Sequence, residues 1–224
     1  MFVDRSMTRD VVTVGPETEI VAAQALMVRK SIRHLPVVEK DDVLVGIITD
    51  RDIRSAMPST VLSEREKTSG EKQLASMKVK EIMTIKPVSV SPTDTLEDVL
   101  LMMQKVKVGA FPVVDREGKL KGIISIRDLM RAFTHVLGLE EPGALLGIVV
   151  ENKVGQMKRI VDAITELGVS FGSILVSQTW EEGKRAVFPY LLTNNAAKVK
   201  KHLREKGFTL LDPMEWCLDE LPKR

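Results

Sequence analysis

The stretch GIITDRD, residues 46–52, returns as GIISIRD at residues 122–128, 76 positions later. Shifting the chain by 76 residues aligns 7–57 with 83–133 without a gap, and sixteen of these fifty-one positions are identical. Two copies of one supersecondary unit, each too small to bury its apolar face alone, are expected to pack against each other.

The apolar residues of each copy change their spacing in a fixed order. In the first copy a short extended piece, 11–14, precedes a helix and two apolar strands, 35–38 and 43–48, and a second helix begins near residue 49. The second copy repeats this order, with a clear helical stripe at 96–103. Each copy is therefore predicted to be a β-α-β-β-α unit.

The turn before the last helix is the most distinctive part of the repeat. It reads hydroxyl-x-Arg-Asp at 49–52 and at 125–128. As a capping box, the hydroxyl would accept from the third helical amide while the acid reaches back. As a ligand site, the helix start and the arginine would hold a phosphate, and the aspartate would accept from a ribose diol. Pro36 and Pro112 cannot donate within a sheet, so they favour edge strands whose unpaired backbone groups could bind a purine edge. The residues alone leave both interpretations open.

The run from Met-Thr, through Val-x-Pro and Pro-Val-Val, to Gly-Ile-Ile-[Thr/Ser]-x-Arg-Asp resembles the cystathionine-β-synthase-type (CBS) domain, here as a tandem pair over roughly residues 1–135. The resemblance implies two repeats about a pseudo-twofold axis with two clefts between them. It also implies an adenosine ligand, such as AMP, ADP, ATP or S-adenosylmethionine, and no catalysis.

The resemblance further implies which residues line each cleft, with the turn of one repeat facing the first strand and the segment before the proline of the other. The first predicted set is Thr8, Thr13, Arg33, His34, Ser125, Arg127 and Asp128. The second predicted set is Thr84, Ser89, Gly109, Ala110, Thr49, Arg51 and Asp52. Because the pair at 33–34 is basic and bulky where 109–110 is small, the two clefts are expected to differ in affinity.

The last third of the chain carries no copy of the repeat. Its strand and helix patterns follow the order β-α-β-β-α-β over 144–211, which is typical of a ferredoxin-like fold. The segment resembles the ACT domain, a small-molecule sensor of amino-acid metabolism, with Asn152, Gly155 and Gln156 as a possible effector site. Because the acid and the proline of the family motif are absent here, dimerisation without a ligand is the preferred interpretation. The lysines and the arginine on the helix at 196–206 are expected to form a solvated face opposite Val199 and Leu203.

Composition narrows the classes of function. The chain has 33 basic and 31 acidic residues, a formal charge of +2 and only 4% aromatic residues, which disfavours nucleic acid as a partner. Its start carries charges where a signal peptide needs an apolar core, and its apolar runs are too short to span a bilayer, so a cytoplasmic protein is expected. The three histidines are far apart and the single cysteine is Cys217, so neither a metal site nor a catalytic nucleophile is predicted.

Together these patterns predict an α/β protein: a CBS pair followed by an ACT-type domain, as in bacterial AcuB-type proteins linked by name to acetoin utilisation. The predicted segments are 1–57 (first repeat), 58–77 (linker), 78–138 (second repeat), 144–212 (ACT-like domain) and 213–224 (tail). The predicted function is a non-catalytic sensor that binds an adenine nucleotide as regulatory ligand and signals to its own assembly or to a target protein. The protein is expected to form a homodimer. The alternatives are a sensor of S-adenosylmethionine or NAD(H), or an interaction module that binds no nucleotide.

Overall fold

The computed structural model describes residues 1–56, 76–178 and 180–211. The chain divides into two compact units, Met1–Met130 and Arg131–Arg224. Most of the expected linker and the whole of the expected tail, including Trp216 and Cys217, lie outside the described residues.

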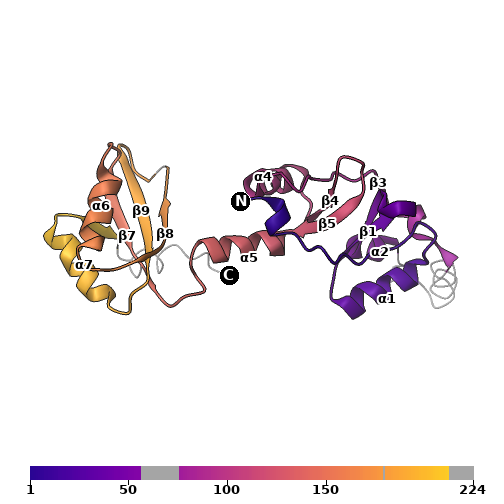
Figure 1. Ribbon diagram of the computed structural model, residues 1–224, viewed down its shortest axis with the longest axis horizontal. Coiled ribbons are helices and arrows are strands. Elements are labelled where there is room, and N and C mark those ends of the chain that lie inside the picture. The colour runs from indigo at the N-terminus through magenta and orange to yellow at the C-terminus, as the bar shows by residue number, and fades with distance from the viewer. Residues whose placement is uncertain (57–75, 179, 212–224) are drawn as a thin grey trace, which may run out of the picture. The chain divides into compact units, whose positions relative to one another are not determined.

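The first unit contains the two copies of the repeat, and nearly every element of the first copy returns 76 residues later (Figure 1). The first copy consists of η1 (Val3–Arg5), α1 (Ile20–Lys30), β1 (His34–Val38), η2 (Lys40–Asp42), β2 (Leu44–Thr49) and α2 (Asp50–Ala56). The second consists of η3 (Val79–Glu81), β3 (Thr84–Ile85), α4 (Leu96–Val106), β4 (Ala110–Val114), β5 (Leu120–Ser125) and α5 (Ile126–Val136). Both first helices end at a left-handed residue, Ser31 or Lys107.

The expected first strand of each copy is wrong in extent. Residues 11–14 and 88–90 each supply a single parallel bridge, Val14 to Val37 and Val90 to Val113. A proline follows two residues after each bridge, and because proline has no N–H to donate, the chain leaves the sheet there. In the second copy the first strand is β3, which lies a few residues before 88–90 in the sequence.

The two copies exchange short segments. β3 of the second copy pairs with β2 of the first, with Thr84 opposite Ile47. In return, the Thr8 amide donates to the carbonyl of Ile123 at 2.9 Å, and the Ile123 amide donates back at 3.0 Å. Each copy therefore completes the sheet of the other, as expected of units too small to stand alone.

This exchange explains the repeated glycine. A Cβ on Gly46 would lie 2.5 Å from the Met83 sulfur, and a Cβ on Gly122 would lie 2.6 Å from the Met7 sulfur. Only glycine leaves room for the crossing segment. The methionine of each copy therefore packs on the glycine of the other copy, which explains why the motif repeats both residues.

Each copy has its own apolar core. In the first, α1 packs on the strands through buried side chains that include Ile20, Leu35 and Ile48. The corresponding residues of the second copy, Leu96, Phe111 and Ile124, are also fully buried. β1 is an end strand of the order β1-β2-β3, so Pro36 lies near a sheet edge as predicted. The expected unpaired backbone groups are not found beside it, because the Pro36 carbonyl accepts from the Val14 amide at 3.2 Å and the Val38 amide donates to the Val14 carbonyl at 3.0 Å.

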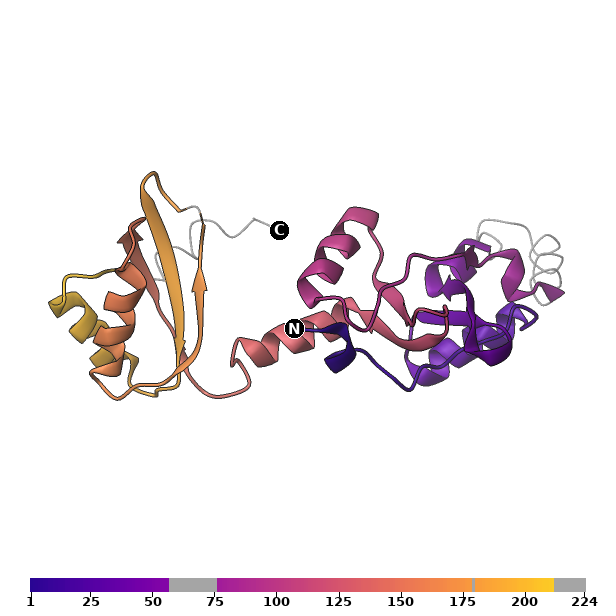
Figure 2. The ribbon, with the colours of Figure 1, turned by 45° about the horizontal axis from the view of Figure 1, so that its top comes forward.

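The second unit has the predicted order of elements. These are β7 (Gly147–Glu151), α6 (Gln156–Thr165), β8 (Phe171–Val176), β9 (Lys184–Leu191), α7 (Ala196–Glu205) and β10 (Thr209–Leu211), preceded by the short β6 (Ala144–Leu145). The sheet runs β10-β7-β9, with β6 and β8 also paired to β9. α6 and α7 cover one face of this sheet (Figures 1 and 2), and the apolar core lies between the two helices and the sheet.

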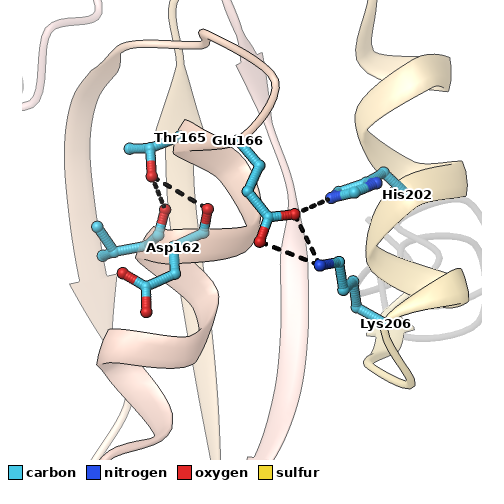
Figure 3. Close-up of polar contacts among 6 residues, drawn as sticks. Asp162, Thr165, Glu166, His202 and Lys206 are labelled. Atoms are coloured by element: carbon cyan, nitrogen blue, oxygen red, sulfur yellow. Dashed lines mark hydrogen bonds and ion pairs between the residues drawn. The ribbon is translucent and has the colours of Figure 1, made fainter.

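The basic residues of α7 lie on the solvent side, as predicted. Val199 and Leu203 are buried, whereas Lys198, Lys201 and Arg204 are exposed. Figure 3 shows that Glu166 at the end of α6 accepts hydrogen bonds from Lys206 and pairs with His202. The hydrogen bond from Lys206 holds the pKa of Glu166 below its ordinary value. This part of the basic helix therefore fastens α7 to α6.

Two aromatic residues of the second unit, Trp180 and Phe188, are in contact. Trp180 is half-buried and meets the Phe188 ring edge-on, with ring centroids 5.9 Å apart. Within the described part of the chain its ring thus packs on β9.

Candidate ligand cavity

The repeated turn of the first copy is a closed hydrogen-bonded ring. One carboxylate oxygen of Asp52, Oδ2, accepts from the Thr49 amide at 2.8 Å and from the Thr49 hydroxyl at 2.7 Å. The Asp52 amide donates to the Thr49 hydroxyl oxygen at 3.3 Å. This is the reciprocal geometry of a capping box.

The turn of the second copy has the same geometry. Asp128 Oδ2 accepts from the Ser125 amide at 2.9 Å and from the Ser125 hydroxyl at 2.6 Å. The capping interpretation is therefore confirmed in both copies, and the interpretation as a ligand site stays a prediction. The two aspartates differ in exposure, since Asp128 is 5% exposed and Asp52 is half-buried.

A cavity of about 570 Å³ opens beside the turn of the first copy. Both copies build its wall, which includes the start of β1, the turn after β2, the start of β3, the end of α4 and the start of β4. Its lining residues are Arg33, His34, Ile47, Thr49, Asp50, Arg51, Asp52, Arg54, Thr84, Pro87, Val88, Val106, Lys107, Val108, Gly109, Ala110, Phe111 and Pro112. The volume is within the range of small-molecule sites, which lies at roughly 300–1,000 Å³.

The cavity combines an apolar wall with a cluster of charged side chains. The cations are Arg33, Arg51, Arg54 and Lys107, and the carboxylates are Asp50 and Asp52. Arg54 forms an ion pair at 2.8 Å with Asp50, which lies one turn earlier on α2. The positive charge of the wall exceeds the negative charge, so the cavity favours an anion.

His34 is a neutral member of this wall. Burial lowers the pKa of its imidazole below the ordinary value, the positive charge of Arg33 lowers it further, and Asp52 acts in the opposite direction. The ring lies against the other copy, since a Cβ on Gly109 would be 3.5 Å from His34 Nε2. At neutral pH this imidazole therefore offers one donor and one acceptor.

The structure brings together most of the second predicted set. Thr49, Arg51, Asp52, Thr84, Gly109 and Ala110 all line the cavity, whereas Ser89 does not. Arg33 and His34, which were grouped with the first predicted set, line this same cavity. The side chains of 33–34 come from the same copy as the turn at 49–52, because His34 pairs with Thr49 across β1 and β2.

The remaining members of the first set lie around the turn of the second copy. Thr8 is adjacent to Ile123, two residues before Ser125, and Thr13 is half-buried on the segment before Val14. Arg127 is exposed at the start of α5, one residue before Asp128.

Sequence reasoning missed two cations of the cavity. Arg54 stands three residues after Arg51 on α2, a spacing that places both on one helix face. The repeated motif ends at Asp52, so it does not include Arg54. Lys107 comes from the left-handed end of α4, and its place in the cavity depends on how the two copies pack.

The predicted effector residues of the second unit lie in the loop between β7 and α6. Gly155 has φ +93°, a conformation that favours glycine, and it begins α6. The Asn152 amide donates to the Gly183 carbonyl at 2.8 Å, and Gln156 accepts from Arg159 at 3.1 Å. The tight strand-to-helix turn is thus present, and ligand binding there stays a prediction.

Within the described residues, no group of three His, Cys, Asp or Glu side chains could hold a metal ion. No helix in the same ranges has the length and apolarity needed to cross a membrane.

The model of one protein family, the CBS domain, matches the chain twice, at residues 3–59 and 79–135. The chain belongs to the CBS domain family. A CBS domain-containing protein of Dictyostelium discoideum is 34% identical over 137 residues, which cover 61% of this chain and 94% of that protein. Inosine-5'-monophosphate dehydrogenase of Aquifex aeolicus is 28% identical over 73% of this chain, but the match spans only 36% of the enzyme.

Solved structures match the same CBS pair. An acetoin utilization protein (AcuB) described from Vibrio cholerae is 30% identical, with a TM-score of 0.52 over 63% of this chain and 98% of that one. CBSX2 in complex with AMP is 29% identical, with a TM-score of 0.50 over 59% of this chain and 95% of that one. The CBS pair of protein MJ0100, in complex with 5'-methylthioadenosine and S-adenosyl-L-methionine, is 26% identical, with a TM-score of 0.50 over 59% and 99%.

Proposed function

We propose that this protein is a non-catalytic sensor that binds an adenine nucleotide in the cavity beside Asp52. The observation that carries the proposal is the composition of that cavity. The first CBS domain supplies three arginines and the capping carboxylate of Asp52, and the end of α4 supplies Lys107. The second CBS domain supplies most of the apolar wall that faces them. A phosphorylated nucleoside needs all three features: cations for phosphate, an acceptor for the ribose diol and an apolar wall for the base.

Asp52 has an oxygen suited to the ribose. Its Oδ2 atom is engaged with Thr49, and within the described ranges no hydrogen-bond donor reaches the other oxygen, Oδ1. A hydroxyl of the ribose could donate to Oδ1 without opening the cap. The phosphate would then lie among Arg33, Arg51 and Arg54.

The charge of the cavity favours AMP, ADP or ATP over S-adenosylmethionine, because the sulfonium of the latter is cationic. The relatives support adenosine compounds in general, since CBSX2 contains AMP and the CBS pair of MJ0100 contains methylthioadenosine and S-adenosylmethionine. S-adenosylmethionine and NAD(H) are therefore the alternative ligands.

The second unit would carry the signal. Its β-α-β-β-α-β order and the sheet order β10-β7-β9-β8 support a ferredoxin-like domain of ACT type. We propose that it serves mainly for pairing between chains and secondarily as an effector site at the loop of Asn152 and Gly155. The likeness to AcuB suggests acetoin or related carbon metabolism in the cytoplasm, with a homodimer and a target protein as partners.

Isothermal titration calorimetry of nucleotide-stripped protein with AMP, ADP, ATP and S-adenosylmethionine tests the proposal. Micromolar binding of a phosphorylated adenosine that is lost in Asp52→Ala supports it. Tightest binding of S-adenosylmethionine would favour the sulfonium alternative. If no ligand produces heat or a thermal shift, the protein is an interaction module and its turns are only caps.

A further inference from the structure

The two copies differ at most of the charged positions of the cavity. Moving 76 residues from Arg54 leads to Met130, from Asp50 to Ile126, and from Arg33 to Gly109. The counterpart of Lys107 in the first copy is Ser31. Of the six charged side chains that line the cavity, only Arg51 and Asp52 keep their charge in the other copy, as Arg127 and Asp128.

These exchanges change the electrostatics of the two turns. Four cations and two carboxylates give the cavity a net charge of +2 while His34 is neutral. The counterparts of these six residues carry one cation and one carboxylate. Among the counterparts of the other lining residues, Lys30 and Arg33 stand in place of Val106 and Gly109, and Arg33 itself lines the cavity at Asp52. In place of the ion pair between Arg54 and Asp50 stand two apolar side chains, Met130 and Ile126, which are 62% and 49% exposed.

The aspartates themselves differ in the same direction. Asp52 is half-buried and lines the cavity, whereas Asp128 is 5% exposed. A phosphate must exchange its water for charged donors, so it binds where cations converge and not where methionine and isoleucine replace them.

We propose that the two duplicated turns differ in function. The cavity at Asp52 binds one anionic nucleotide per chain, and Arg54 and Lys107 make it selective for the anion. The turn at Ser125 and Asp128 serves as a helix cap. This inference rests on the proposed function and adds to it the number of sites and the residues that select the ligand. The shared arginine of the motif then has two roles, binding phosphate at 51 and facing solvent at 127.

The two copies offer matched pairs of variants. Arg51→Met and Arg127→Met remove the same residue from the same turn, and both side chains are exposed, so neither change disturbs a core. Arg54→Met installs the side chain that the other copy already carries at the equivalent helical position. Lys107→Ser does the same at a left-handed residue, because Ser31 adopts φ +53° where Lys107 has φ +56°.

Calorimetric titration with AMP and with ATP provides the readout, and the melting temperature of each variant reports its folding. We expect one AMP per wild-type chain. Arg51→Met, Arg54→Met and Lys107→Ser should each weaken AMP or ATP binding by roughly tenfold, since each removes a charge-assisted contact. Arg127→Met should change the affinity by less than about twofold.

Several results would overturn the inference while leaving the proposed function intact. They are two equal sites per wild-type chain, equal losses in Arg51→Met and Arg127→Met, or unchanged binding in both Arg54→Met and Lys107→Ser. If the wild-type protein binds neither AMP nor ATP, the proposed function fails together with the inference.

Discussion

Replacing Gly122 by alanine should destabilise the first unit, because the new methyl group would enter the space of the crossing segment. Its Cβ would lie 2.6 Å from the Met7 sulfur and 2.9 Å from the Thr8 carbonyl oxygen. The sulfur can move, but the Thr8 carbonyl accepts from the Ile123 amide, and the Thr8 amide donates to the Ile123 carbonyl, so the backbone of Thr8 is held in place. Overpacking of this kind costs about 1–3 kcal/mol, and the fixed carbonyl favours the upper part of that range.

A loss of this size should lower the melting temperature of the first unit by roughly 4–10 °C. Circular dichroism follows the whole protein, while both tryptophans belong to the sequence of the second unit, so tryptophan fluorescence provides an internal control. Gly15→Ala is the matched control, because the nearest atom to its Cβ would be the Thr18 hydroxyl at 4.0 Å. If Gly122→Ala melts at the same temperature as the wild type, or if only the fluorescence transition moves, the crossing segment is not the reason why this position requires glycine.

Two further predictions concern the caps and the histidine. Ser125→Ala should cost the ligand-free protein about 1 kcal/mol, measured by urea unfolding, because the cap of α5 loses its hydroxyl; no loss would mean that the backbone contacts to Asp128 suffice. The free energy of unfolding should fall as the pH drops below about 6.5. The pKa of His34 is lowered in the folded protein, so below this pH the unfolded chain binds a proton at His34 more readily than the folded chain does. His34→Gln should lose that part of the pH dependence, and an unchanged profile between pH 7 and 5 would contradict the argument.

Elements that depend on a local pattern could be predicted from the sequence. The spacing of apolar residues and the positions of the prolines gave the bounds of the helices and hairpins to within a few residues. The exchange of β3 could not, because a strand of two residues has no period and its partner lies in the other copy. The cavity shows the same limit. The turn at 49–52 was recognisable as a motif, whereas the positions of Arg33 and Lys107 depend on which way their side chains point once the copies are packed.

The capping role of Asp52 affects how any binding experiment on this protein is interpreted. One carboxylate oxygen caps α2 while the residue lines the cavity, so Asp52→Ala removes a cap and a ligand contact together. Losing the cap costs about 1 kcal/mol, whereas a nucleotide at a hundred times its dissociation constant stabilises the folded state by about 2.7 kcal/mol. A shift in melting temperature on adding nucleotide therefore exceeds the effect of the cap. Asp52→Asn separates the two further, because an amide oxygen can still accept from the Thr49 amide while the negative charge is lost. A variant that keeps its ligand-free stability but no longer responds to nucleotide would assign the response to the charge of Asp52 and not to the helix that it caps.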